Sequence, residues 1–127
     1  MSEDWYKLAD YSNNGLESEF CAPGGRFNQS FQGANSTCAF GISPCYLLDG
    51  VVAAGSQNSY YYSVGTSMAT PYASGVAALI ISENLCKFKG KPLAVAAEMR
   101  KRAADKGEPG LDGLFGYGFV QSGYNAT

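Results

Sequence analysis

The sequence predicts an α/β fold, and three stretches of the chain carry this prediction. Residues 60–64 (Tyr-Tyr-Tyr-Ser-Val) read as a strand, because aromatic residues favour extended backbone. Residues 70–84 are apolar nearly all round when drawn as a helix, which is typical of a buried helix. A second helix is expected after Pro92, with one apolar face. The 127 residues allow one small domain, which offers few layers to cover a central helix on both sides.

The first half of the chain is expected to hold short strands, joined by turns and by one long loop. Turns are marked by Gly, Asn, Ser and Pro, and the loop by its richness in Gly, Ser, Asn and Gln. In chain order we expect a turn at 13–15, a short strand at 19–22 running into Pro23-Gly24-Gly25, a surface-loop insertion at 25–45, one or two strands within 46–53, and a turn at 55–59 before the strand 60–64.

The second half is expected to pack one helix face against the core. Val95, Met99 and Ala103 recur at i, i+4 and define that apolar face. We expect the charged residues of this helix to lie on its other, solvent-facing sides: Glu98, Arg100, Lys101 and Arg102. Gly107 is a candidate stop for the helix, and an extended segment is expected at 114–120.

Charge and hydropathy narrow the possible partners. The net charge of −2 is too small to indicate nucleic acid or a membrane surface, and no run of about 18 apolar residues predicts a membrane span. Seven of the nine basic residues lie between Lys87 and Lys106, and we interpret this run as a solvated loop and helix face.

The four cysteines permit two disulfides in an oxidising compartment, or four buried thiols. Cys38 and Cys45 are the pair that we expect to be bonded, because they flank a short loop containing Gly41 and Pro44. A zinc site is not expected, because the chain has no histidine and no Cys-x-x-Cys spacing.

The most informative segment is Gly65-Thr66-Ser67-Met68-Ala69-Thr70-Pro71, which brings a serine to the entry of the apolar helix. A nucleophilic serine must be exposed and needs a base within hydrogen-bond reach. The N-terminus of a helix adds unpaired N–H groups and partial positive charge, which suit a developing oxyanion. Gly65 permits the turn, and Pro71 suits a first helical turn. The structural alternative is that Thr66 or Ser67 only caps a core helix.

At these residues the chain resembles the subtilisin-like serine proteases (subtilases, peptidase family S8). Gly65 to Pro71 is similar to the nucleophile signature of that family, and Ser67 matches its catalytic serine. After Pro71 the family reads His-Val-Ala-Gly, whereas this chain reads Tyr-Ala-Ser-Gly; that histidine is not the one in the triad. Three further segments resemble the family in the same order along the chain: 9–15, 20–24 and 116–120.

The resemblance implies the C-terminal portion of a three-layer α/β/α catalytic domain, so that residues 1–127 form a single partial domain. It implies that Ser67 is the nucleophile, with Gly65 and Thr66 supporting the turn and the oxyanion site, and that Tyr62, Ser63 and Val64 border the substrate cleft. The triad aspartate and histidine and the oxyanion-hole asparagine lie upstream in the family, so we expect this chain alone to be inactive and its partner to be the missing N-terminal portion.

The resemblance further implies polypeptide substrates, a secreted or extracytoplasmic location, and no cofactor. Calcium commonly stabilises the family, but no cluster of oxygen ligands is evident in the sequence. The sedolisins, acid peptidases that use glutamate and aspartate in place of histidine, also carry Gly-Thr-Ser, although Met68 to Pro71 is more similar to subtilisins. Two other interpretations stay open: a non-catalytic module that binds a partner half, and a small disulfide-braced structural protein.

Overall fold

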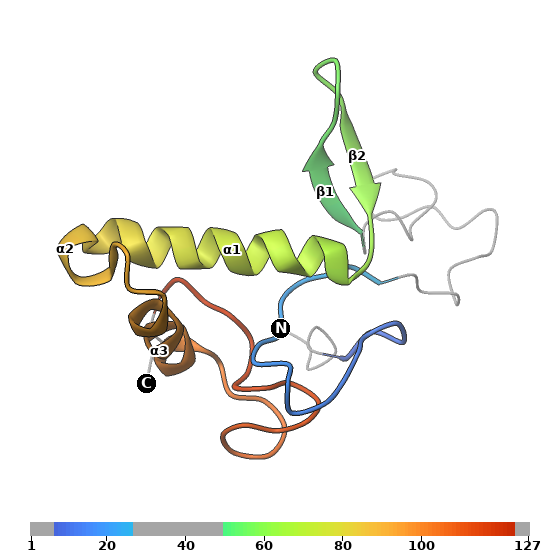
Figure 1. The fold of residues 1–127 in the computed structure, drawn as a ribbon. Coiled ribbons are helices and arrows are strands. Elements are labelled where there is room, and N and C mark those ends of the chain that lie inside the picture. Colours follow the sequence, from blue (N-terminus) through green and yellow to red (C-terminus); the bar gives the residue numbers. More distant parts are fainter. Residues whose placement is uncertain (1–6, 27–49, 124–127) are drawn as a thin grey trace. The chain divides into compact units, whose positions relative to one another are not determined.

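The computed structural model describes residues 7–26 and 50–123. In chain order these form β1 (Val51–Ala54), β2 (Tyr60–Ser63), α1 (Thr66–Glu83), α2 (Leu85–Phe88) and α3 (Pro92–Arg102), as Figure 1 shows. The chain divides into two compact units, Pro23–Ala69 and the remainder. The predicted loop insertion at 25–45 lies almost entirely outside the described residues.

The first unit contains an antiparallel hairpin made of β1 and β2. The N–H of Ser59 donates to the carbonyl of Ser56 at 3.1 Å and closes the turn. The two central turn residues, Gln57 and Asn58, have φ values of 55° and 57°. Positive φ at both positions is the geometry of a type I′ turn, whose twist matches that of the strands. The turn predicted at 55–59 and the strand predicted at 60–64 are therefore confirmed.

The second unit is built around one face of α1. Its core consists of apolar side chains from the three helices and the C-terminal segment: Val76, Ile80, Phe88, Val95, Met99 and Val120. The side chain of Leu79, next to the fully buried Ile80, is 54% exposed. The prediction of burial nearly all round is therefore wrong for this chain, because α2, α3 and the C-terminal segment contribute core residues to one side of the helix only.

Two extended segments of this unit pair without forming regular strands. The N–H of Cys21 donates to the carbonyl of Gly118, and the N–H of Val120 donates to the carbonyl of Cys21, both at 3.0 Å. A Cβ added to Gly118, whose φ is +114°, would overlap the main chain of Ala104. Glycine is therefore required where three backbone segments approach closely. The strand predicted at 19–22 and the extended segment predicted at 114–120 appear only as isolated bridges.

Val95 and Met99 of α3, and Ala103 directly after the helix, are buried as predicted, but α3 also buries two charged residues. Arg102 is 4% exposed and Glu98 is 7% exposed. The prediction that both lie on solvent-facing sides is wrong. The reason is that a partner from another helix neutralises each of them, and helical periodicity on α3 alone contains no information about that partner.

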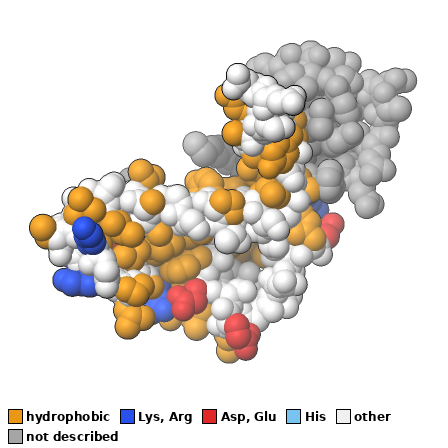
Figure 2. Space-filling model, turned by 45° about the horizontal axis from the view of Figure 1, so that its top comes forward, with side chains coloured by type: hydrophobic (Ala, Val, Ile, Leu, Met, Phe, Trp, Pro, Cys, Tyr) orange, Lys and Arg blue, Asp and Glu red, His pale blue; other side chains and the backbone are white. Residues whose placement is uncertain are grey.

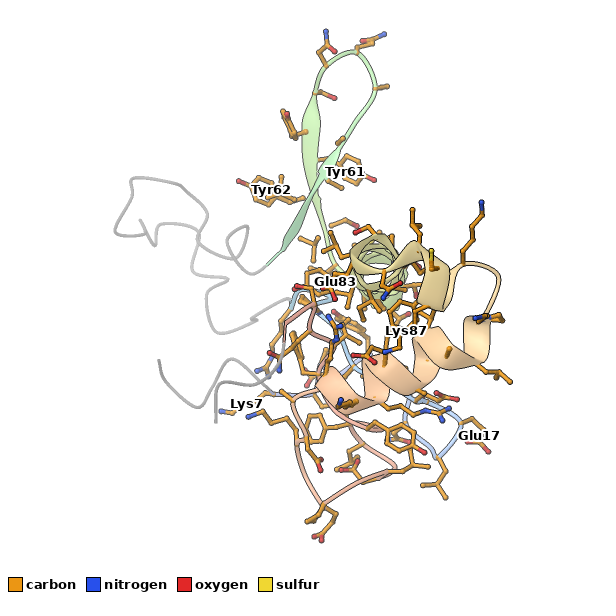
Figure 3. The ribbon with its side chains drawn as sticks, turned by 90° about the vertical axis from the view of Figure 1, so that its left-hand side faces the viewer. Lys7, Glu17, Tyr61, Tyr62, Glu83 and Lys87 are labelled. Carbon is orange, nitrogen blue, oxygen red and sulfur yellow. The ribbon has the colours of Figure 1, made fainter. Side chains whose placement is uncertain are left out.

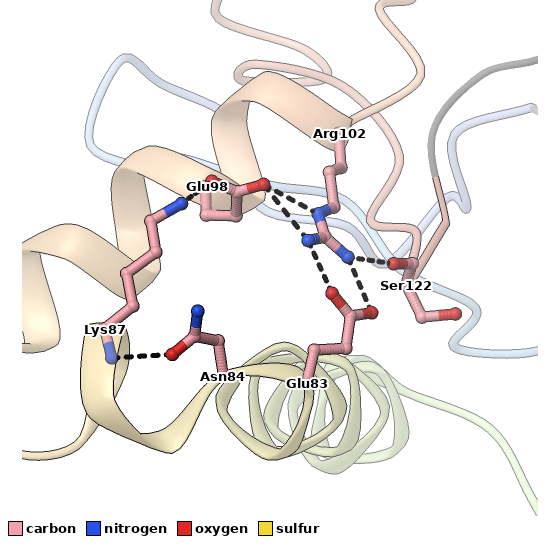
Figure 4. A network of polar contacts seen from close by, with 6 residues as sticks. All are labelled: Glu83, Asn84, Lys87, Glu98, Arg102 and Ser122. Carbon is pink, nitrogen blue, oxygen red and sulfur yellow. Dashed lines mark hydrogen bonds and ion pairs between the residues drawn. The ribbon is translucent and has the colours of Figure 1, made fainter.

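These buried charges belong to a polar network that ties α3 to the end of α1 (Figure 4). The guanidinium of Arg102 donates to both carboxylate oxygens of Glu83, at 2.8 and 2.7 Å, to Glu98 at 3.1 Å, and to the main-chain carbonyl of Ser122. Lys87 Nζ donates to the other oxygen of Glu98 at 3.1 Å. The hydrogen bonds from Arg102 lower the pKa of Glu83 below its ordinary value. The network therefore holds the C-terminal ends of both helices to the last described residues.

None of the helices in the described part of the chain has the length and apolar character that a bilayer-spanning segment requires.

Candidate active site

Ser67 lies in the first turn of α1, which begins at Thr66. The helix thus starts four residues earlier than the predicted Thr70. The start is fixed by the carbonyl of Gly65, which accepts the N–H groups of Met68 at 3.0 Å and Ala69 at 3.4 Å. Ser67 is exposed, and within the described residues neither its hydroxyl nor its N–H has a hydrogen-bond partner. The Ser67 residue is therefore accessible from solvent.

Gly65 makes this turn possible through its backbone conformation. Its φ of +139° lies in a region that side-chain-bearing residues rarely adopt, whereas a Cβ would meet only the nitrogen of Ser67, at 3.9 Å. The N–H of Gly65 donates to the carbonyl of Gly24 at 2.7 Å, within the same unit. Conformation, rather than lack of space, is therefore what demands glycine before the serine.

Pro71 lies inside α1, as its sixth residue, and not in the first turn as the sequence predicted. A residue at this position would donate its N–H to the carbonyl of Ser67, four residues back. Proline has no N–H, so the Ser67 carbonyl is left without its helical partner. The proline therefore removes one helical hydrogen bond at Ser67, the candidate nucleophile.

The helix dipole of α1 favours negative charge near Ser67. The first turn of α1, whose residues are all described, carries no acidic side chain to offset the positive end of the helix dipole. An oxyanion beside the Ser67 N–H would thus meet a donor and a favourable potential together.

The predicted cleft residues Tyr62, Ser63 and Val64 lead directly into this turn. In β2, Tyr62 lies opposite Val52 and Ser63 lies opposite Val51. Tyr62 is exposed, whereas Ser63 and Val64 are partly buried. The side chains of Tyr61 and Tyr62 point to opposite sides of the hairpin (Figure 3), and hydrophobic side chains are visible on its surface (Figure 2).

The cysteines do not form the framework that an even count suggested. Cys21 and Cys86 are both free, so two disulfides are not present, and the alternative of four buried thiols is wrong because Cys86 is exposed. Burial raises the pKa of the Cys21 thiol to about 11. Cys38 and Cys45 lie outside the described residues. No three Cys, Asp or Glu side chains gather as candidate metal ligands within residues 7–26 and 50–123.

Sequence reasoning found the serine turn but missed the Arg102 network. The one available signal was the i, i+4 spacing of Glu98 and Arg102, which is typical of helix pairs both exposed and buried.

Comparison with known proteins identifies relatives that match most of the chain. A family model described as the subtilase family, Peptidase_S8, matches residues 3–118. The chain is 33% identical over 122 residues to the minor extracellular protease Epr of Bacillus subtilis (strain 168), covering 95% of this chain and 15% of that protein.

Two solved structures are similar to this chain. The crystal structure of a lanthipeptide protease matches with a TM-score of 0.69 and 33% identity, over 88% of this chain and 36% of that one. The psychrophilic subtilisin-like protease Apa1 from the Antarctic psychrotroph Pseudoalteromonas sp. AS-11 matches over 54% of this chain and 15% of its own, with 38% identity and a TM-score of 0.45. This chain thus spans only a minor part of the proteins that it matches. The family model, the serine turn and the α/β likeness to the lanthipeptide protease agree, and the chain belongs to the subtilase family of subtilisin-like serine proteases.

Proposed function

We propose that Ser67 is the nucleophile of a serine endopeptidase whose general base comes from polypeptide outside these 127 residues. The observation that carries the proposal is the exposed Ser67, in the first turn of α1, in a chain of the subtilase family. The chain has no histidine, and serine hydroxyls need a base to become effective nucleophiles. The base and the aspartate that orients it are therefore assigned to the missing N-terminal catalytic portion.

In this mechanism the Ser67 oxygen attacks the scissile carbonyl, while the external histidine takes its proton and later gives it to the leaving amine. The N–H of Ser67 donates to the oxyanion, with the Thr66 hydroxyl as a second support. Tyr62, Ser63 and Val64 border the leaving-group side of the cleft, as the resemblance to the subtilases implies for the segment before the nucleophile. The chemistry needs no metal or cofactor, since proton transfer and the helix end supply what the reaction requires.

Three finer features extend the proposal. The substrates are polypeptides, and the intact catalytic domain has three α/β/α layers, as implied by the family. The protein is secreted, which is supported by the extracellular relative Epr.

The chain alone is expected to lack peptidase activity, because loss of a triad member costs several orders of magnitude in rate. The test is labelling with a fluorophosphonate probe, on the chain alone and mixed with an upstream half that contains the histidine and aspartate. Ser67→Ala removes the nucleophile. Ser74→Ala is the matched control, because Ser74 is also an exposed serine of α1, and its hydroxyl donates to the Thr70 carbonyl at 3.0 Å within the same helix.

We expect labelling only in the mixture, retained in Ser74→Ala and lost in Ser67→Ala. Labelling of the pure chain that disappears in Ser67→Ala would show that no external base is needed.

A second candidate function is a non-catalytic module that binds a partner half. It is favoured by the exposure of two large apolar side chains on α1, Leu79 and Tyr72. The same experiment separates the two functions: association of folded halves without any labelling supports the binding module.

A further inference from the structure

We propose that Asn14 is a deamidation site, and that a hydrogen bond from the N–H of Gly15 to the carbonyl of Gly113 holds the reaction back in the folded protein. The inference is independent of the peptidase function, because both segments belong to the unit that does not contain Ser67. It rests on the side chain of Asn14, the conformation of Gly15 and the contact across to Gly113.

The chemistry needs only water besides the chain. The deprotonated main-chain nitrogen of Gly15 attacks Cγ of Asn14 and forms a new N–Cγ bond. The bond from Cγ to the side-chain nitrogen breaks, and that nitrogen leaves as ammonia. Water then opens the five-membered succinimide at either carbonyl, which yields aspartate or isoaspartate. The sum is asparagine plus water giving the acid plus ammonia.

The structure leaves the electrophile accessible. Asn14 is exposed, and within the described residues its side-chain amide has no hydrogen-bond partner. The next residue has no Cβ to hinder the attack. The backbone conformation favours glycine there, because its φ of +136° is one that residues with a side chain rarely adopt. The fold therefore builds in a chemically labile Asn-Gly pair.

The nucleophile, in contrast, is occupied. The N–H of Gly15 donates to the carbonyl of Gly113 at 2.7 Å, and the carbonyl of Gly15 accepts the N–H of Ser18 at 3.1 Å. The nitrogen must lose both its proton and this bond before it can attack, so reaction proceeds only from the locally opened state. Loss of one hydrogen bond on opening slows deamidation by a factor of roughly 2 to 10. Because the neighbouring hydrogen bonds of the segment must open together with it, we expect the rate to fall further than that.

The consequence is a one-way change in this part of the molecule. Isoaspartate inserts a methylene group into the main chain between residues 14 and 15. The Gly15 nitrogen is then displaced from the Gly113 carbonyl, so the modified segment closes less readily than the original one.

The experiment incubates the full chain in mildly alkaline buffer, folded and in urea, and follows deamidation by peptide mass mapping. We expect the folded chain to deamidate at Asn14 at least about tenfold more slowly than the unfolded chain. Asn58-Ser59 is an internal comparator: it is also exposed in a turn, but serine follows it. Asn14→Gln should abolish deamidation in the peptide that contains residue 14 and leave the peptide that contains Asn58 unchanged.

Gly116→Ala tests whether the hydrogen bond from the Gly15 N–H to the Gly113 carbonyl slows the reaction. Gly116 pairs with Asp112 through two main-chain hydrogen bonds, which shape the loop that presents the Gly113 carbonyl. A Cβ at Gly116 would overlap the main chain of Glu19. We expect faster deamidation at Asn14 in this variant. If this variant does not fold, hydrogen exchange in the unaltered chain tests the same contact, because a Gly15 amide that is hydrogen-bonded to Gly113 should exchange slowly. Equal rates in folded and unfolded chains, or an unprotected Gly15 amide, would overturn the proposal.

Discussion

Replacing Arg102 with methionine should destabilise the protein by about 3 kcal/mol. Removing one partner of a buried ion pair typically costs roughly 3–5 kcal/mol, because the other charge stays buried without compensation. Here the charge left behind is Glu98, whose side chain is 8% exposed. The low end applies, because Lys87 still contacts Glu98 and the Glu83 carboxylate, 48% exposed, can turn to water. Methionine fills the space of the arginine stem, so little of the loss comes from a cavity.

The assay is urea unfolding followed by helical circular dichroism, with linear extrapolation to water. Arg100→Met is the matched control on the same helix. Arg100 pairs with Glu19, but the side chains are 39% and 45% exposed, so water screens the pair and its contribution to stability should be small. Arg102→Met/Glu98→Met removes both buried charges and should recover most of the loss. An Arg102→Met variant that loses no more stability than Arg100→Met would refute a buried ion pair. So would a double variant whose loss of stability equals the sum of the losses in Arg102→Met and Glu98→Met.

Four other predictions concern the same unit. Gly118→Ala should lower the free energy of unfolding by about 2 kcal/mol, because the φ of Gly118 is positive and a Cβ would overlap main-chain atoms. Gly75→Ala should raise it by roughly 0.5–1 kcal/mol, because Gly75 lies within α1 and nothing is near its added Cβ. Melting temperatures of the two variants test both predictions. Hydrogen bonds from main-chain N–H groups lower the pKa of Asp112 in the folded protein. The charged carboxylate therefore stabilises the fold at any pH above the pKa that Asp112 has in the unfolded chain. This stabilisation is lost as the pH falls through the lower pKa that Asp112 has in the folded protein. Asp112→Asn should therefore be less stable than the parent near neutral pH, and the gap in urea midpoints should close below about pH 4. The thiol of Cys21, whose pKa is raised to about 11, should react with iodoacetamide at least about tenfold more slowly than that of the exposed Cys86. Equal rates in mapped peptides would contradict the partial burial of Cys21.

Local sequence patterns were sufficient wherever the structure depends on local rules. The hairpin turn at 55–59 and the strand before the serine follow from turn residues and from aromatic β-propensity. The core face of α3 follows from the spacing of Val95 and Met99. The run from Gly65 to Pro71 was sufficient to indicate the family, which the comparisons show.

Local patterns were insufficient at the start of α1. The helix begins at Thr66 because the carbonyl of Gly65 accepts the first helical bonds. A proline six residues into a helix argues for a later start when propensity alone is considered. The observed start brings Ser67 into the first turn, which is the feature that the proposed chemistry uses.

The sequence by itself determined the type and order of the main elements, the residues of the serine turn and the lack of a histidine base. Only the tertiary structure decided that Arg102 and Glu98 are buried, that one face of α1 is left uncovered, and that the segments around Cys21 and Gly118 pair. The physical reason is that these outcomes depend on groups distant in sequence. A carboxylate on α1 neutralises a guanidinium on α3, and a carbonyl more than ninety residues away pairs with the N–H of Cys21. Periodicity and propensity describe neighbours along the chain, whereas burial of charge depends on neighbours in space.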